Sequence, residues 1–406
     1  MAATGGRRAV VVGGSMSGLL SALQLRRAGW EVDVFERVES ELSGRGAGIV
    51  AQQELMERLR ALDLRTDDLG VQIAKRKIFD AQGRVTCETP CPQVVTAWER
   101  VYRLLRDAFP PEHYHRGRAF VRYEQDAMAV SAYFSEGETV RADLLIGADG
   151  IRSTVRQQCA PEVAPLYAGY VAWRALLSES GIPTSAHRDV FELMAFGLPP
   201  GEQFLVYPVA GPDNDLRVGH RRANVVWYRP ADEMTKLQWL LTDESGYTHA
   251  ISIPPPLIRR EAIEEMRADA ERLLAPQFRQ IVRLIDEPIL QPIYDLESTR
   301  MAFGRVAVLG DAAFVARPHV AAGVSKASDD AAALADALTV EGDVAAGLRR
   351  FEAVRLPENH SIIARARHLG AYLQATRTEE EQVRAGRHST DAAVLKETAV
   401  LDFLYA

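Results

Sequence analysis

The sequence has few of the features that mark specialised classes of protein. Only three cysteines, Cys87, Cys91 and Cys159, occur among its 406 residues, and their spacing matches no recurring metal-binding pattern. A small, odd number of cysteines suits a reducing cytoplasm better than a disulfide framework. We therefore expect a cytoplasmic protein without a metal site.

Long apolar runs are also missing. No segment of the sequence approaches the roughly 20 uninterrupted apolar residues that cross a bilayer. The apolar N-terminal stretch is broken by Gly13, Gly14 and Gly18 and leads straight into a helical pattern, unlike a signal-peptide core. The formal net charge of -7 argues against nucleic acid or an anionic membrane as a partner. Small molecules are the expected partners.

The composition is that of an ordinary globular enzyme, with 47% hydrophobic and 25% charged residues. A chain of this length exceeds one ordinary core. Short β-branched runs predict buried parallel strands at 8–12, 144–148 and 306–309, whereas 167–228 alternates like an antiparallel sheet. Together these patterns predict an α/β fold with an inserted sheet, against which a substrate pocket could form.

The strongest motif follows the first predicted strand and occupies residues 13–18. Gly13 permits a tight turn, Gly18 permits close packing of helix on strand, and Ser15 stands at the second glycine position of a dinucleotide fingerprint. Backbone N–H groups at the start of the following helix can hold a pyrophosphate. Glu36 ends the next strand, 23 residues after Gly13, where a carboxylate accepts ribose hydroxyls. The motif therefore favours FAD or NAD over a structural turn beside a surface glutamate.

Two further motifs end the later buried strands, Gly147-Ala148-Asp149-Gly150 and Gly310-Asp311-Ala312-Ala313. Each alone is also compatible with an ordinary strand-ending turn. The order of the three motifs resembles the class A flavoprotein aromatic hydroxylases, the p-hydroxybenzoate hydroxylase group, from Val10 to about Leu338. Four regions resemble the dihydroxypyridine hydroxylases within that group: Val12–Ser15, Leu42–Val50, Tyr167–Val171, and Arg317–His319 with Lys326–Asp330.

The resemblance implies FAD as cofactor and NADH or NADPH as reductant, without a separate dinucleotide domain. Asp311 would then bind the ribityl chain, and Asp149 with the turn at Gly150 would support both cofactors. In this family an arginine that contacts FAD commonly precedes the helix near residue 101, where this chain has Trp98. Arg100 or Arg103 could substitute for it, and the alternative is that both are solvated charges on the helix. Further contacts with a cofactor are expected from Arg37, Arg45, Gly48, Gly310 and Gly323.

In the reaction that the resemblance implies, NAD(P)H reduces FAD, and molecular oxygen forms a C4a-hydroperoxyflavin that hydroxylates a small aromatic ring. A (di)hydroxypyridine is the expected substrate, and a hydroxybenzoate is the alternative. His319, after Pro318 in the loop beside the flavin, is the candidate base or donor. Tyr207 and Tyr228 are candidate donors to a ring hydroxyl, although strand tyrosines also serve as packing residues.

We thus expect a Rossmann-like FAD-binding domain (1–70, 96–165 and 290–345), an inserted, mostly antiparallel β-sheet substrate domain (71–95 and 166–289) and a helical C-terminal region (346–406). A homodimer is plausible from the family. Two rival functions use the same fold: a flavin-dependent dehydrogenase or oxidase, and a flavin-binding sensor without turnover.

Overall fold

The computed structural model describes residues 6–42 and 48–401 and is built around two large sheets. The first has six strands in the order β16-β17-β10-β1-β2-β6, all parallel except β16. Its strands are β1 (Arg8–Val12), β2 (Glu31–Glu36), β6 (Tyr114–Arg116), β10 (Leu144–Gly147), β16 (Ala302–Phe303) and β17 (Val306–Val308). The three buried parallel strands predicted from β-branched runs are therefore confirmed.

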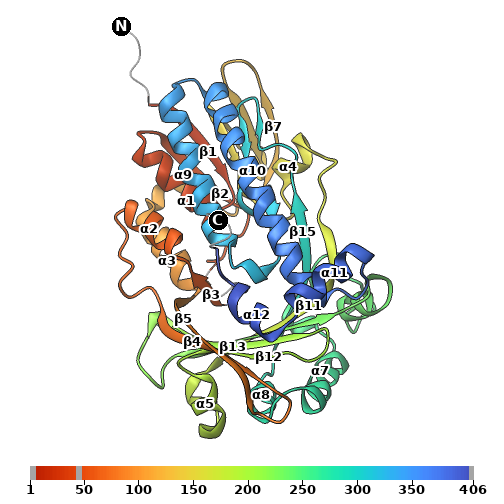
Figure 1. Cartoon of the computed structure of the whole chain (residues 1–406). Helices are drawn as coiled ribbons and strands as arrows, with labels where there is room; N and C mark the ends of the chain where they lie inside the picture. Colours follow the sequence, from red (N-terminus) through yellow and green to blue (C-terminus); the bar gives the residue numbers. More distant parts are fainter. Residues whose placement is uncertain (1–5, 43–47, 402–406) are drawn as a thin grey trace.

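Helices cover one face of this parallel sheet (Figure 1). α1 packs against α9 and α3, and α9 also packs against α2 and α10. In α1, Leu19, Leu20 and Leu25 are fully buried although they point in different directions around the helix, because α1 lies between the sheet and the helices α3 and α9. The helix ends before Gly29, whose φ of +86° is left-handed, as a C-terminal cap requires. The helices of this layer are α1 (Met16–Arg27), α2 (Gln53–Ala61), α3 (Trp98–Ala108), α9 (Gly323–Glu341) and α10 (Val344–Gly370).

The second sheet has nine strands in the order β18-β15-β11-β14-β13-β12-β4-β5-β3. All its pairs are antiparallel except β12 with β4, which confirms the expected mostly antiparallel sheet. Its strands are β3 (Gly48–Ala51), β4 (Val71–Phe79), β5 (Val85–Ala97), β11 (Leu166–Ser178), β12 (Met194–Gly197), β13 (Gln203–Val209), β14 (Arg222–Pro230), β15 (Ile289–Glu297) and β18 (Phe314–Val315).

The two faces of this sheet have different roles. Phe204, Val206 and Trp227 pack on one face against the helices below it in Figure 1. Because side chains alternate along a strand, Leu205 and Tyr207 point to the opposite face, toward the parallel sheet. The remaining helices are α4 (Thr154–Cys159), α5 (Thr184–Val190), α6 (Gln238–Leu241), α7 (Arg260–Leu273), α8 (Pro276–Val282), α11 (Glu379–His388) and α12 (Asp391–Glu397).

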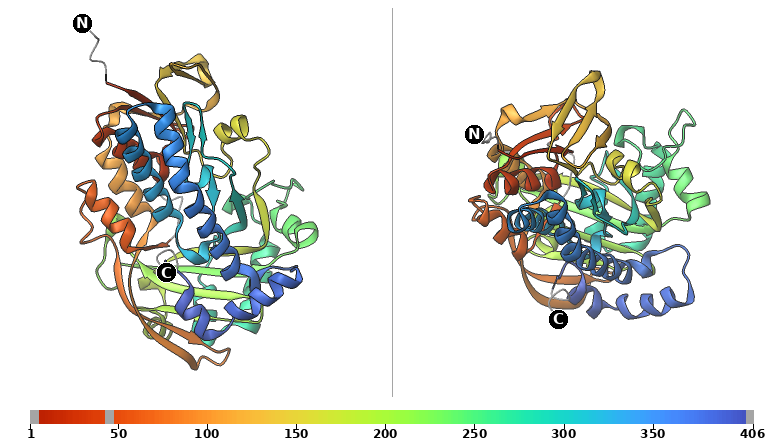
Figure 2. Two further views of the ribbon diagram at one scale, coloured as in Figure 1. Left: turned by 45° about the horizontal axis from the view of Figure 1, so that its top comes forward. Right: turned by 90° about the horizontal axis from the view of Figure 1, so that it is seen from above.

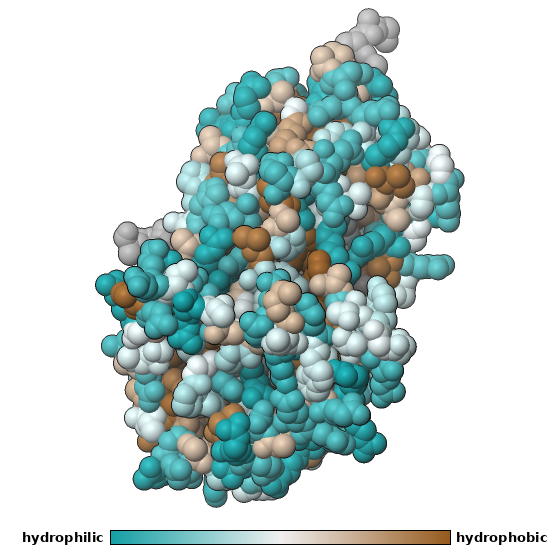
Figure 3. Space-filling model, turned by 90° about the vertical axis from the view of Figure 1, so that its right-hand side faces the viewer, coloured by the Kyte–Doolittle hydropathy of each residue, from teal (hydrophilic) through white to brown (hydrophobic). Residues whose placement is uncertain are grey.

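A small three-stranded sheet of β7 (Phe120–Gln125), β8 (Val130–Phe134) and β9 (Thr139–Ala142) completes the fold. It packs on the parallel sheet through Phe134, whose ring stacks on Phe35 with centroids 4.1 Å apart. Figure 2 shows α9 and α10 side by side along the outside of the molecule. On the face in Figure 3, apolar residues occur singly or in small groups among hydrophilic ones. None of the helices in the described ranges has the length and hydropathy of a bilayer crossing.

Candidate active site

The glycine-rich turn after β1 has the geometry that the fingerprint predicts. Gly13 has a φ of +107°, and a Cβ there would collide with the carbonyl of Ala148. A Cβ on Gly18 would collide with the carbonyl of Gly13, so both positions require glycine for close approach. Ser15 precedes α1 and makes no side-chain capping bond with the described residues, which leaves the first N–H groups of the helix free for an anion.

Glu36 is held at the edge of this turn by backbone N–H groups. Its Oε2 accepts a hydrogen bond from Gly14 N and its Oε1 accepts one from Val38 N, both at 2.9 Å. The hydroxyl of Tyr114 also donates to the carbonyl of Gly14 at 2.8 Å. The predicted ribose-binding carboxylate is therefore fixed in orientation, and it lines a cavity of about 380 Å³.

This first cavity brings together most of the residues predicted to bind the cofactor. It extends from Glu36 and Arg37, past the start of α1, to Asp311. Sequence reasoning missed Arg118, which lines the cavity from the loop before β7. The predicted residues in its lining are Gly13, Ser15, Glu36, Arg37, Asp149, Gly150 and Asp311, and other residues there include Trp98, Arg118 and Arg152.

Asp149 lies before α4 and accepts hydrogen bonds from the first residues of this helix. Its Oδ2 accepts hydrogen bonds from Thr154 N at 2.7 Å and Val155 N at 3.3 Å, and its Oδ1 accepts one from the Ser153 hydroxyl. Burial raises the pKa of the Asp149 carboxyl above its usual value despite these bonds. The side chain thus shapes the turn at Gly150, and it contributes to the cavity wall at the same time.

Arg156 links the second motif to the third. It is 2% exposed, and it donates hydrogen bonds to the carbonyls of Ile151 at 2.6 Å and Ala312 at 2.7 Å. Nothing in the local sequence revealed this role, because Ala312 is 156 positions away. The arginine fixes the relative position of the two turns that face the cavity.

The Gly310-Asp311 turn is positioned by the helical layer. Gly310 has a φ of +60°, and a Cβ there would collide with the side chain of Ser17. Its N–H donates to Asp330 Oδ2 at 3.1 Å, and Asp330 in turn accepts a hydrogen bond from Arg355 at 2.8 Å. The turn presents the Asp311 carboxyl to the cavity. Desolvation by the surrounding protein raises the pKa of this carboxyl.

A second cavity of about 370 Å³ lies between this turn and the nine-stranded sheet. Ser15, Ser17, Trp98 and Asp311 line both cavities, so the two cavities adjoin at this turn. Predicted site residues in the second lining are Gly48, Tyr207, Tyr228, Pro318, His319 and Gly323.

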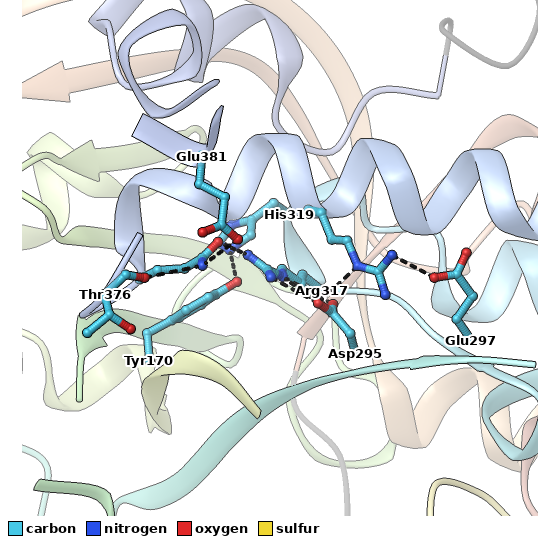
Figure 4. Close-up of polar contacts among 9 residues, drawn as sticks. Tyr170, Asp295, Glu297, Arg317, His319, Thr376 and Glu381 are labelled. Atoms are coloured by element: carbon cyan, nitrogen blue, oxygen red, sulfur yellow. Dashed lines mark hydrogen bonds and ion pairs between the residues drawn. The ribbon is translucent and has the colours of Figure 1, made fainter. Parts of the chain in front are cut away.

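His319 lies in the loop between β18 and α9, and its Nε2 is 2.9 Å from the hydroxyl of Tyr170 (Figure 4). Burial, together with the positive charge of Arg317, lowers the pKa of His319 to about 3. The imidazole is therefore neutral near pH 7, and it can exchange hydrogen bonds without carrying charge.

A buried network of charged residues holds this loop (Figure 4). Arg317 donates to Asp295 at 2.9 Å and to Gln374 Oε1 at 2.8 Å. Arg367 of α10 donates to the same aspartate at 3.2 Å and to Glu297 at 2.6 Å. Because Asp295 lies on β15 and Arg367 on α10, the network joins the sheet, the loop and the helical layer.

Tyr207 and Tyr228 point into the second cavity from neighbouring strands. Burial raises the pKa of Tyr228 to about 12 and raises that of Tyr207 further. Neither hydroxyl makes a hydrogen bond with a residue in 6–42 or 48–401, so both are free to meet a ligand. The positive charge of Arg174 opposes the rise for both tyrosines, which places a cation near their hydroxyls.

Arg174 and Gln203 are among the polar residues of this cavity that sequence reasoning missed, and Gln291 and Thr398 are others. Arg174 donates to Gln291 Oε1 at 2.8 Å. The only available signal for Gln203 was its spacing, four residues before Tyr207 on one strand face. Their convergence depends on strand pairing that the local sequence does not reveal.

Of the other residues named from the sequence, some line the cavities and others lie outside them. A Cβ on Gly48 would lie 2.8 Å from Tyr207 and Asn224, so glycine is needed where β3 meets the sheet. The two arginines offered as substitutes lie in ion pairs outside both cavities, Arg100 with Asp68 at 3.0 Å and Arg103 with Glu99 at 2.8 Å. Trp98 instead lines both. Arg45, with the rest of 43–47, lies outside the described residues.

Residues 398 and 399 close one side of the second cavity. Ala399 N donates to the carbonyl of His319 at 2.6 Å, and the Ala399 carbonyl accepts from Gln93 at 2.9 Å. Arg76 donates to the carbonyl of Thr398 at 2.5 Å. The segment after α12 is thereby fixed across the cavity, far in sequence from the other walls.

Comparison with known proteins points to flavin-dependent enzymes. A family model described as FAD binding domain-like matches residues 167–295. The chain is 34% identical to 2,6-dihydroxypyridine 3-monooxygenase of Paenarthrobacter nicotinovorans, over 90% of this chain and 91% of the relative. It is 29% identical to 3-amino-4-hydroxybenzoate 2-monooxygenase of Streptomyces cremeus, over 89% and 86% of the two chains. The solved 2,6-dihydroxypyridine-3-hydroxylase from Arthrobacter nicotinovorans superposes with a TM-score of 0.85 at 34% identity, covering 91% of this chain and 93% of that one.

The chain belongs to the FAD-dependent aromatic hydroxylases, the class A flavoprotein monooxygenases. It is an FAD-dependent monooxygenase with NAD(P)H as its reductant. The expected fold class, family and cofactors are therefore confirmed.

Proposed function

We propose that this monooxygenase hydroxylates a small hydroxylated aromatic ring, most specifically a (di)hydroxypyridine, in the second cavity. The observation that carries the proposal is that polar side chains from the nine-stranded sheet line the same cavity as the loop that contains His319. These side chains are Arg174, Gln203, Tyr207 and Tyr228. The 34% identity with a dihydroxypyridine monooxygenase supports the choice of ring. A hydroxybenzoate remains the alternative substrate.

Bound FAD supplies the reduced flavin that activates oxygen for transfer to the ring. We propose that the turn at 13–18 and the start of α1 hold its pyrophosphate, and that Glu36 holds its ribose. Asp311 would bind the ribityl chain, from the junction of the two cavities. Gly323 begins α9, whose N-terminus faces the same space and favours negative charge on the cofactor.

The protein would activate the ring by favouring its ionised hydroxyl. Arg174 supplies a positive charge, and the free hydroxyls of Tyr207 and Tyr228 supply hydrogen-bond donors. His319 is neutral and would position the ring through hydrogen bonds, with Pro318 fixing the backbone before it. Apolar walls from Met194, Leu205 and Val226 would limit the entry of water.

We retain the expected division into an FAD-binding domain (1–70, 96–165, 290–345), a substrate domain (71–95, 166–289) and a C-terminal region (346–406) as a proposal. A homodimer is proposed from the family resemblance. A cytoplasmic location is proposed from the three cysteines, which are all unpaired.

The test follows NADH and NADPH oxidation and oxygen uptake by the FAD-loaded enzyme with 2,6-dihydroxypyridine and with hydroxybenzoates. Strong stimulation by the pyridine, with one hydroxylated product per NAD(P)H, is expected. If only hydroxybenzoates stimulate oxidation, the substrate is a hydroxybenzoate and not a (di)hydroxypyridine. Flavin reduction by the ring without NAD(P)H would favour a dehydrogenase or oxidase, and absence of any turnover would favour a sensor.

A further inference from the structure

Gln203 is the first residue of β13, and its side chain points to the second cavity. It pairs across the sheet with Tyr228, which lines the same cavity. Leu205 and Tyr207, the alternate residues along the strand, line it as well, whereas Phe204 packs into the core below the sheet. Strand alternation therefore places the Gln203 amide beside the proposed ring position.

The Gln203 amide is buried without hydrogen bonds. The residue is 1% exposed, and neither Oε1 nor Nε2 has a partner among the residues that the structure describes. Two neighbouring amides each have at least one partner: Gln291 accepts from Arg174 at 2.8 Å, and Asn224 Oδ1 accepts from Gly48 N at 2.8 Å, although Asn224 Nδ2 has none among the described residues. Because an unpaired buried amide is unfavourable, a ligand that supplies both partners is strongly selected.

A primary amide presents an acceptor and a donor side by side in one plane. Its complement is a ring edge with an N–H next to a C=O, which is the lactam form of a 2-hydroxypyridine. The same two-bond geometry lets glutamine read the donor and acceptor edge of adenine. A phenol has a C–H at the position of the ring N–H, so it would leave Gln203 Oε1 unpaired.

We propose that Gln203 recognises the substrate as a nitrogen heterocycle, by pairing Oε1 with the ring N–H and Nε2 with the adjacent carbonyl of a lactam. The inference rests on the proposed function and assigns the choice between pyridine and benzene rings to one residue. A carboxylated benzene would depend on the Arg174 cation instead, and its binding would not involve the Gln203 amide.

The test compares dissociation constants of 2,6-dihydroxypyridine and of its carbocyclic analogue 1,3-dihydroxybenzene for the oxidised, FAD-loaded enzyme, followed by the flavin absorbance. The wild-type enzyme should bind the pyridine at least about tenfold more tightly, because a bidentate amide pair discriminates by roughly this factor or more. Gln203→Met, which keeps the length of the side chain, should abolish this preference.

Gln277→Met is the matched control. Gln277 is buried on α8, outside both cavities, so this variant should keep the full preference. The Gln203→Glu variant offers two acceptors, and it should bind the two-donor edge of 2-aminopyridinium at least about tenfold more tightly than the wild type does.

Equal binding of the two rings by the wild type would overturn the inference, and this arm needs no variant to fold. A preference that persists in Gln203→Met, with normal FAD content, would also overturn it. Because binding is measured without NAD(P)H, failure of turnover would count against the proposed function and would leave the binding result intact.

Discussion

The hydroxyl of Tyr170 and Nε2 of His319 lie 2.9 Å apart, and both side chains are buried. A buried imidazole paired in this way stays neutral, since burial lowers its pKa from the ordinary value of 6.5 to about 3. The folded protein therefore excludes a proton that the unfolded chain binds below pH 6.5.

This exclusion predicts a specific loss of stability in acid. Between pH 7.5 and pH 5, His319 should contribute a destabilisation of about 2 kcal/mol, because the unfolded state gains the proton and the folded state does not. Urea unfolding at both pH values should show that His319→Gln loses less stability than the wild type over this interval. Equal losses in the two proteins would contradict the assignment of a low pKa.

Replacement of Gly13 should reduce FAD binding more than replacement of another glycine with a positive φ does. Gly13→Ala places a methyl group against Ala148, so we expect loss of bound FAD in the purified protein. Gly137→Ala is the matched control, since Gly137 also has a positive φ but has open space around it. The control should lose only about 1 to 2 kcal/mol of unfolding free energy and retain FAD. Comparable FAD contents would refute the close-approach argument.

Arg156→Met should remove the hydrogen bonds that hold the Asp149-Gly150 turn and the Gly310-Asp311 turn in their relative positions. Removing the guanidinium leaves the carbonyl of Ile151 and the buried carbonyl of Ala312 without this donor, at an expected loss of about 3 kcal/mol. Thermal unfolding and FAD retention are the measurements, with the exposed Arg188→Met as control. Wild-type FAD affinity in Arg156→Met would show that the two turns hold their positions without this link.

Loss of the Arg317–Asp295 ion pair should lower the free energy of unfolding much more than loss of an exposed ion pair does. Asp295→Asn leaves the buried Arg317 charge poorly compensated and should destabilise the protein by about 3 kcal/mol. Glu264→Gln, in the exposed pair with Arg260, should have little effect. Denaturant unfolding of both variants tests this. A similar small effect in each would mean that the loop at His319 is held mainly by packing.

Arg174 should lower the pKa of a bound ring hydroxyl. In Arg174→Met we expect that pKa to rise, because the nearby positive charge no longer favours the anion. The ultraviolet spectrum of bound ligand, titrated with pH, measures the change directly, and Arg174→Lys should restore much of the wild-type value. An unchanged ligand pKa in Arg174→Met would assign activation of the ring to the tyrosines.

The sequence predicted the parts of the site that are local. The turn at 13–18, the carboxylate of Glu36 and the strands around them depend on neighbours within one strand-turn-helix unit. Gln203 and Arg174 were missed because their importance arises only when β13, β14 and β11 pair. The closure by residues 398 and 399 was missed for the same reason, since no local pattern relates Ala399 to His319.

The walls that the two cavities share have a thermodynamic consequence. Ser15, Trp98 and Asp311 line both cavities, so we expect a ligand that orders them in one cavity to change the free energy of binding in the other. By linkage this coupling is reciprocal. A ring that tightens the hold on FAD is itself held more tightly when FAD is present, by the same factor.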